Sequence, residues 1–154
     1  MYKRQLQFRA LLHSPKTAGY LASMGAQVRF KTDLPRDLKE LAILLIAREW
    51  NSDIEWTIHA AVAAKAGIST ASIEAIHAGK TPAGLSEREQ VIVRFMQQLL
   101  RNKDMSDEAF AAAQKLLGTT GVVELTLTCS YYTALALTHL VLKPEMEPGI
   151  VSTL

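Results

Sequence analysis

The hydrophobic pattern is most regular over residues 35–67, where two apolar segments flank a short polar one. The first segment, 38–47, is apolar around most of a helical circumference, and the second, 52–66, has apolar residues at helical spacing. Asn51 and Ser52 separate the two segments, and Ser52 has a side chain that suits a helix N-cap. The pattern predicts a helical hairpin whose two helices run antiparallel and in contact.

The rest of the chain predicts more helices and no sheet. No segment alternates with period two over more than a few residues, whereas apolar residues at helical spacing recur between Ser, Pro and Gly signals. We expect an irregular arm over residues 1–13, and a second helix that starts at Thr32 or Asp33. Further helices are expected over residues 15–27, 70–78, 86 to the turn at 102–105, 106–117 and 121–142. The predicted fold class is all-α.

Three polar residues interrupt the apolar faces of the hairpin. Glu55 and His59 are four residues apart, so they lie on one face of the second helix. Glu40 and His59 lie at distances from the turn that differ by three residues, which is about 4.5 Å along a helix axis. Arg48 lies at roughly the level of Glu55. These residues could form a partly buried cluster of two carboxylates, an imidazole and a guanidinium, which would suit general acid–base chemistry.

Spacing alone leaves other interpretations open. Ser52 and Glu55 also match a capping box, in which the glutamate only closes the N-terminus of the helix. Glu40 could be a solvated carboxylate, and His59 a core histidine bonded to a backbone carbonyl. The set of Glu40, Glu55 and His59 could in principle hold a divalent ion, but no second histidine is near in sequence, and we expect no metal and no cofactor.

Composition narrows the class of protein. The chain has 154 residues, enough for one domain (1–154) with a single core. Its 17 basic and 15 acidic residues are scattered, so no basic stripe supports nucleic-acid binding. Hydrophobic residues make up 49% and charged residues 21%, which is rich in apolar surface for a monomer of this size. We therefore expect a homo-oligomer, whether dimer, trimer or hexamer.

Location and redox state follow from simple features. The N-terminal residues carry charges without a long apolar region, so we expect no signal peptide. No uninterrupted apolar stretch of about 18 residues is present, so we expect no membrane span and a cytoplasmic protein. The one cysteine, Cys129, excludes an internal disulfide.

The hairpin also resembles a known family. The residues Glu40-Leu-Ala-Ile-Leu44, Glu55-Trp-Thr-Ile-His59, Gly67-Ile-Ser69 and Ile73-Glu-Ala-Ile76 are similar to the core motif of the carboxymuconolactone decarboxylase family. The similarity covers residues 33–80 well and the rest loosely. It implies an alkylhydroperoxidase D-like helical bundle, built around the central antiparallel hairpin.

The superfamily has two chemical branches, and the sequence distinguishes between them. The peroxidase branch uses a C-x-x-C-x-x-x-H motif, and counting back from His59 its two cysteine positions hold Ser52 and Glu55. A two-cysteine redox mechanism is therefore excluded, and Cys129 is expected to be an inert packing residue. In that branch a glutamate nineteen residues before the histidine joins a proton relay, and Glu40 has this spacing.

The resemblance implies a cofactor-independent lyase or isomerase that acts on a small lactone or organic acid. His59 is the predicted proton shuttle, assisted by Glu55 and Glu40. The local charge is acidic, which disfavours a polyanionic substrate. The competing hypothesis is a non-enzymatic scaffold or ligand-binding protein that keeps the fold without the chemistry. The predicted substrate-binding residues are Arg48, Trp56, Tyr131, Tyr132 and His139.

Two of these candidates are adjacent in sequence. Tyr131 and Tyr132 lie on one predicted helix, where neighbouring side chains point about 100° apart. At most one of them should therefore face the cluster around His59. The alternative is that both only pack, with their hydroxyl groups at the rim of the protein. Arg48 is a candidate for binding a substrate carboxylate, or it could neutralise a neighbouring glutamate.

Overall fold

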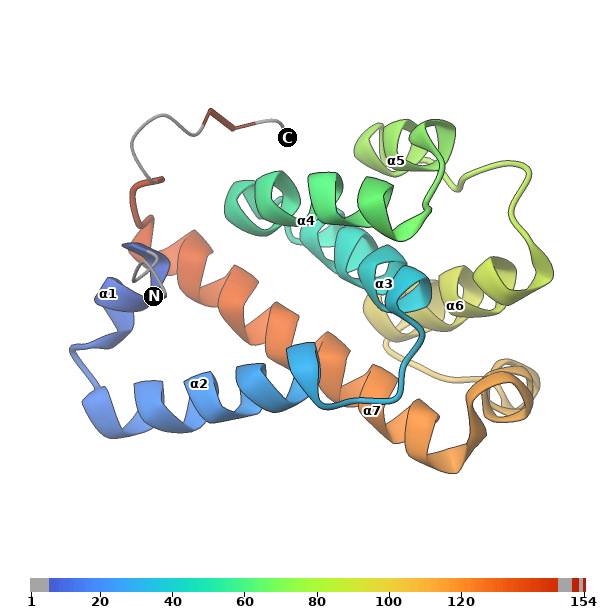
Figure 1. Cartoon of the computed structure of the whole chain (residues 1–154), viewed down its shortest axis with the longest axis horizontal. Helices are drawn as coiled ribbons and strands as arrows, with labels where there is room; N and C mark the ends of the chain where they lie inside the picture. Colours follow the sequence, from blue (N-terminus) through green and yellow to red (C-terminus); the bar gives the residue numbers. More distant parts are fainter. Residues whose placement is uncertain (1–5, 147–150, 153) are drawn as a thin grey trace.

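The computed structural model describes residues 6–146, 151, 152 and 154, and this part of the chain is all-helical, as predicted. Seven α-helices are present in it, and no strand (Figure 1). A π-helical turn, η1 (Gln98–Asn102), follows the sixth helix. The helices are α1 (Leu6–Leu11), α2 (Pro15–Phe30), α3 (Arg36–Glu49), α4 (Asp53–Ala66), α5 (Thr70–His77), α6 (Glu87–Gln97) and α7 (Asp107–Leu142).

Helix α3 is the centre of the fold. Every residue from 38 to 47 is buried, and the helix packs against α4, α5, α6 and α7. Helix α4 returns beside it after a turn in which Asn51 adopts a left-handed conformation with φ 48°, which asparagine tolerates better than most residues. The predicted hairpin is thus present, and its first helix carries much of the hydrophobic core.

Helix α7 has an internal break. Gly118 has φ 70° and ψ 171°, so it separates a segment before it from the long segment that runs to Leu142. The break falls where the sequence predicted one, although the second segment begins a few residues earlier than expected. That segment crosses the molecule diagonally in Figure 1, and α7 as a whole packs against α2, α3, α4 and α6. Its C-terminal end therefore comes close to the start of α4.

By length and composition, α7 is the one helix in the described residues that is long and apolar enough to cross a membrane. This is weak evidence, because a core helix passes the same test and 44% of the relevant 18-residue stretch is buried within the fold. No uninterrupted apolar stretch marks this helix in the sequence, because isolated polar residues divide the sequence of α7.

The predicted helix boundaries differ from the observed ones at three places near the N-terminus. Residues 6–11 form α1 where an irregular arm was predicted, while residues 1–5 of that arm lie outside the described residues. Helix α2 continues to Phe30, and α3 begins only after Pro35. Lys39 explains the longer α2: its buried Nζ donates to the carbonyl oxygens of Val28 and Arg29 at 3.3 and 2.9 Å, which satisfies the end of that helix.

Candidate functional site

The hairpin brings Glu40 and His59 into direct contact. Glu40 Oε2 lies 2.7 Å from His59 Nδ1, and both residues are buried. A carboxylate only accepts hydrogen bonds, so Nδ1 is the donor and Nε2 points away from Glu40. The backbone carbonyl interpretation of His59 and the solvated interpretation of Glu40 are therefore both wrong. Glu40 and His59 therefore lie at the same level of the hairpin, as their distances from the turn predicted.

Glu55 lies on the other side of the His59 ring. Its Oε2 is 3.6 Å from His59 Nε2, and its Oε1 is 3.8 Å from Nδ1 of His139, which comes from α7. Only 2% of Glu55 is exposed, and Oε1 has no hydrogen-bond partner among the described residues. Burial raises the pKa of Glu55, while the positive charges of His59 and Arg29 oppose the shift. A protonated carboxyl group is therefore favoured between the two imidazole rings.

Ser52 does not cap α4. Its side chain makes no cap hydrogen bond, and its Oγ lies 3.4 Å from His139 Nδ1. The capping-box interpretation of Ser52 and Glu55 is therefore wrong, whereas Ser86 and Glu89 do form a complete capping box at the start of α6. Glu40, His59, Glu55, His139 and Ser52 together form what we call the polar network.

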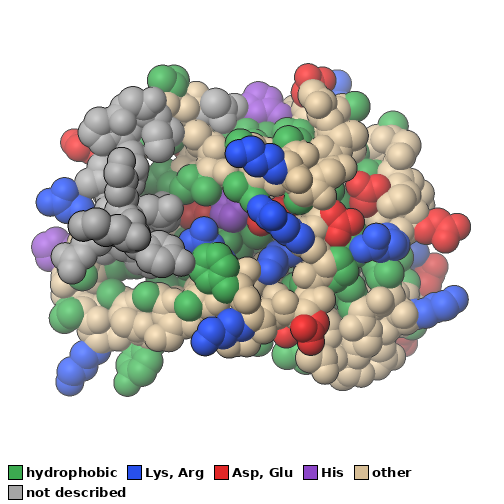
Figure 2. All heavy atoms as spheres, in the orientation of Figure 1, with side chains coloured by type: hydrophobic (Ala, Val, Ile, Leu, Met, Phe, Trp, Pro, Cys, Tyr) green, Lys and Arg blue, Asp and Glu red, His purple; other side chains and the backbone are tan. Residues whose placement is uncertain are grey.

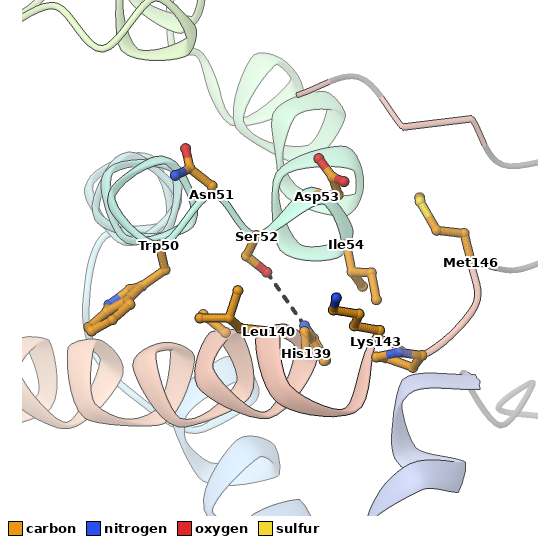
Figure 3. Close-up of a pocket in the computed structure, with 11 residues that line it drawn as sticks. Trp50, Asn51, Ser52, Asp53, Ile54, His139, Leu140, Lys143 and Met146 are labelled. Atoms are coloured by element: carbon orange, nitrogen blue, oxygen red, sulfur yellow. Dashed lines mark hydrogen bonds between the residues drawn. The ribbon is translucent and has the colours of Figure 1, made fainter.

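The polar network ends at a cavity between the start of α4 and the end of α7 (Figure 3). This α4–α7 cavity has a volume of about 260 Å³, and Ser52 and His139 are among its lining residues. His59, 5% exposed, and Glu55 do not line it. Burial lowers the pKa of His139 to about 4, so its imidazole is neutral at neutral pH. The buried acid–base groups thus reach the cavity wall through His139.

The rings of His59, Tyr132 and Tyr131 pack one against the next in that order. The Tyr132 ring meets the His59 ring edge-on, with centroids 5.1 Å apart, and Tyr131 meets Tyr132 at the same centroid distance. Only Tyr132 touches the histidine, in keeping with their divergent directions. Both residues are buried and neither lines the α4–α7 cavity, so they pack as the alternative expected, although their hydroxyl groups do not lie at the rim. Burial raises the pKa of Tyr131 to about 12 and that of Tyr132 further, and the charge of Glu55 adds to both shifts.

Arg48 and Trp56 are placed elsewhere. Arg48 Nε donates to the backbone oxygen of His77 at 2.7 Å, and its guanidinium also bonds Asn51. Trp56 is buried, and its ring packs on the His77 ring with centroids 5.4 Å apart. Both side chains tie α5 to the hairpin, and neither lines the α4–α7 cavity. Glu49, one of the glutamates that Arg48 could have neutralised, forms its ion pair with Arg101 instead, with 3.0 Å between Arg101 Nε and Glu49 Oε2.

Sequence reasoning missed Lys143 and Arg29. Lys143 follows α7 and lines the cavity, and its left-handed backbone (φ 43°) ends the helix. A helix stop before Pro144 was visible in the sequence, but the proximity of this stop to α4 was not. Arg29 lies on α2, and its charge acts on Glu55 and on both tyrosines.

Neither a metal cluster nor a reactive thiol is found near the polar network. Within residues 6–146, 151, 152 and 154, no group of three or more His, Cys, Asp or Glu side chains is arranged to hold a metal ion. Cys129 is buried, and burial raises the pKa of its thiol, which favours the unreactive protonated form.

No protein-family model matches the sequence, and no curated protein matches it. The geometry of the site is therefore the basis for the assignment of function.

Proposed function

We propose that the protein is a cofactor-independent acid–base enzyme, of the lyase or isomerase type, that acts on a small lactone or organic acid. One observation carries the proposal: a buried carboxylate–imidazole pair, Glu40 and His59, is linked through Glu55 and His139 to a cavity large enough for a small molecule. Protein interiors seldom hold this many ionisable groups without a functional reason.

Each residue of the network has a distinct part in the proposed chemistry. His139, in the cavity wall, takes a proton from a substrate carbon next to a carbonyl group. The C–H bond breaks, and its electrons form an enolate, whose oxygen the Ser52 hydroxyl can hydrogen-bond. Glu55 passes the proton on to His59, whose charge Glu40 balances. Return of the proton to another carbon, or to the opposite face of the same carbon, completes an isomerisation. In a decarboxylation the bond to the carboxylate carbon breaks instead of the C–H bond, CO₂ leaves, and the protonated His139 ring donates a proton to the resulting carbanion.

Family membership is part of the proposal. The motif around the hairpin resembles the carboxymuconolactone decarboxylase family, and we propose that the helices form an alkylhydroperoxidase D-like bundle. Two observations support this: α3 and α4 form the central hairpin, and Ser52 and Glu55, at the positions of the two cysteines of the peroxidase branch, both approach His139. The polar network would then replace a redox pair with a proton-transfer group.

A homo-oligomer in the cytoplasm also belongs to the proposal. Val123, Leu127, Leu137 and Val141 recur along one side of α7 and are 41–74% exposed, which makes an apolar stripe that a second copy of the chain could cover. Exposed hydrophobic side chains also lie beside charged ones along α2 in Figure 2. Light scattering on the purified protein would measure the oligomer, and Leu127→Lys should lower its mass.

The test is solvent deuterium exchange. Keto acids and small lactones are incubated with the protein in D₂O, and NMR follows replacement of the protons next to the carbonyl group, above the rate without protein. We expect at least one compound to exchange, and His59→Gln to abolish this while circular dichroism shows an intact helical fold. Exchange by His59→Gln at the wild-type rate, or no exchange in any compound, would contradict the proposal.

A second candidate function is ligand binding without turnover. It is favoured by the burial of His59 and Glu55 away from the cavity wall, which leaves His139 and Ser52 as the polar network's contacts with a ligand. The same experiment separates the two functions, because a binding protein would show ligand-induced chemical-shift changes at the cavity without any deuterium exchange.

A further inference from the structure

We infer that the α4–α7 cavity binds a small monocarboxylate, with the carboxylate group between Lys143 and the first turn of α4 and the apolar part of the molecule against Ile54 and Leu140. The inference deepens the proposed function, on which it rests for the chemistry that follows binding. Binding itself depends only on the cavity.

Lys143 supplies the positive charge of the cavity. It lines the cavity, and no ion pair of its ammonium group occurs among the described residues. In Figure 3 its amino group lies on the same side as the Ser52 hydroxyl and the His139 ring. The left-handed backbone at Lys143 is uncommon for a residue with a side chain.

The start of α4 adds partial positive charge. Ser52, Asp53 and Ile54 all line the cavity, so the N-terminal turn of this 14-residue helix faces it. The first N–H groups of a helix lack partners within the helix, and no side chain caps them here because Ser52 is turned toward His139. Exposed N–H groups and the helix dipole favour an anion at this position.

A polar group of the core lies directly behind the cavity wall. Oε1 of Glu55 is buried without a hydrogen-bond partner among the described residues, and it lies 3.8 Å from the His139 ring that lines the cavity. Glu55 does not line the cavity, and burial, which raises the pKa of its carboxyl group, favours the protonated form and so reduces the negative charge behind the His139 ring. The ring of His139, neutral for the same reason, does not repel a ligand of either sign.

The balance of charge selects a single carboxylate. Among the described residues that line the cavity, Asp53 is the only acidic one, and its carboxylate points away from Lys143 and His139 in Figure 3. One ammonium group opposite one acidic residue suits a monoanion better than a phosphate or a dicarboxylate. Ile54, Leu140 and Met146 give the rest of the wall an apolar character, which suits a short hydrocarbon body.

Matched pairs of small acids and amides test the inference. Butyrate and benzoate are compared with butyramide and benzamide, and succinate serves as a dianion. Backbone NMR shifts of the full chain report affinity and location. We expect each monocarboxylate to bind about tenfold more tightly than its amide, with the largest shifts at residues 52–54 and 139–143, since a charge-assisted hydrogen bond contributes about that factor. Equal affinities, tighter binding of succinate, or no binding of any acid would overturn the inference.

Lysine variants locate the charge. Lys143→Gln should reduce the affinity for butyrate and benzoate by about tenfold and leave the amides unchanged, while Lys143→Arg should retain most of the affinity. Lys80→Gln, at an exposed lysine outside the cavity lining, is the matched control and should bind like the wild type. Unchanged acid binding in Lys143→Gln would contradict the assignment.

The same probes separate this inference from the proposed function. His59→Gln should bind butyrate like the wild type, because His59 does not line the cavity, but should lose deuterium exchange. If no compound exchanges deuterium while monocarboxylates still bind through Lys143, the proposed enzyme function fails and the cavity assignment stands. If exchange occurs with equal affinities for acids and amides, the cavity assignment fails and the enzyme function stands.

Discussion

The two ends of the polar network differ in how firmly they are held. At the inner end, Glu40 and His59 are nineteen residues apart on two adjacent helices, and their side chains form a 2.7 Å hydrogen bond. At the outer end, Ser52 and His139 are 87 residues apart, and the contacts of His139 are 3.4 Å to Ser52 and 3.8 Å to Glu55. The inner end is therefore preformed, whereas the outer end has distances that a bound molecule can shorten.

The surroundings of each end explain this difference. Helix α3 is buried around its whole circumference over residues 38–47, so the backbone that carries Glu40 has little freedom to move. The end of α7 has the cavity on one side, where Leu140 lines it, and the exposed Val141 and Leu142 do not line it. Close packing thus orients the acid–base pair, and looser packing leaves room for the ligand.

Removal of the ring that packs on His59 should have the largest effect. Tyr132 is buried and meets His59 edge-on, so Tyr132→Ala should lower the free energy of unfolding by roughly 3–5 kcal/mol, as for other buried aromatic residues. Tyr132→Phe keeps the ring and should cost much less. Chemical denaturation of both variants measures this, and equal losses would mean that the hydroxyl group, and not the ring, holds the inner end.

The carboxylate of Glu40 should matter next. Glu40→Gln keeps the shape but removes the charge that balances His59, and we expect deuterium exchange to slow about 100-fold, the lower range for a lost acid–base group. Glu49→Gln, which removes a partner of Arg101 near the surface, is the matched control and should exchange normally. The deuterium exchange rates of the two variants are compared with that of the wild type. Similar slowing in both would show that the Glu40 carboxylate has no specific role in the exchange.

Acid should destabilise the outer end. The folded-state pKa of His139 is about 4, below its unfolded value near 6.5, so unfolding takes up a proton between these pH values and stability falls as the pH decreases through them. The loss is roughly 3 kcal/mol once the pH has fallen through both values. Glu55, with its raised pKa, contributes with the opposite sign above pH 4.5. Denaturation across pH 4–7 should show a flatter acid-side slope for His139→Gln, and a steeper one would contradict the account.

The thiol should matter least. Cys129 is buried on α7, and its raised pKa keeps it protonated. Cys129→Ala should leave deuterium exchange within about twofold and cost about 1 kcal/mol of stability for the small volume lost. Loss of exchange in this variant, or rapid alkylation of the native protein, would show that sulfur chemistry contributes after all.

The sequence supported the inner end of the site better than the outer one. Glu40, Glu55 and His59 lie within one hairpin, so helical spacing and the position of the turn were enough to bring them together. The parts of Ser52 and Lys143 depend on where α7 crosses the start of α4, which no local pattern records. Ser52 was accordingly taken for a cap.

Other errors have the same cause. Arg48 was placed at the level of Glu55, but the carbonyl oxygen of His77 on α5 offers it a closer partner. Lys39 is a charged residue within an apolar segment, yet it is buried and closes the end of α2. In both cases a contact with another helix decided the position of the side chain. The period of the apolar residues predicted the helices, whereas the hydrogen-bond partners of these side chains depend on how the helices pack together.

The most direct test of the account is deuterium exchange by Glu55→Gln. Burial raises the pKa of Glu55 and so favours its protonated form, which glutamine matches in shape and charge but without a proton to transfer. We predict that this variant binds butyrate within about twofold of the wild type and exchanges deuterium about 100-fold more slowly. Exchange at the wild-type rate would mean that the proton does not pass between the cavity and His59 through Glu55.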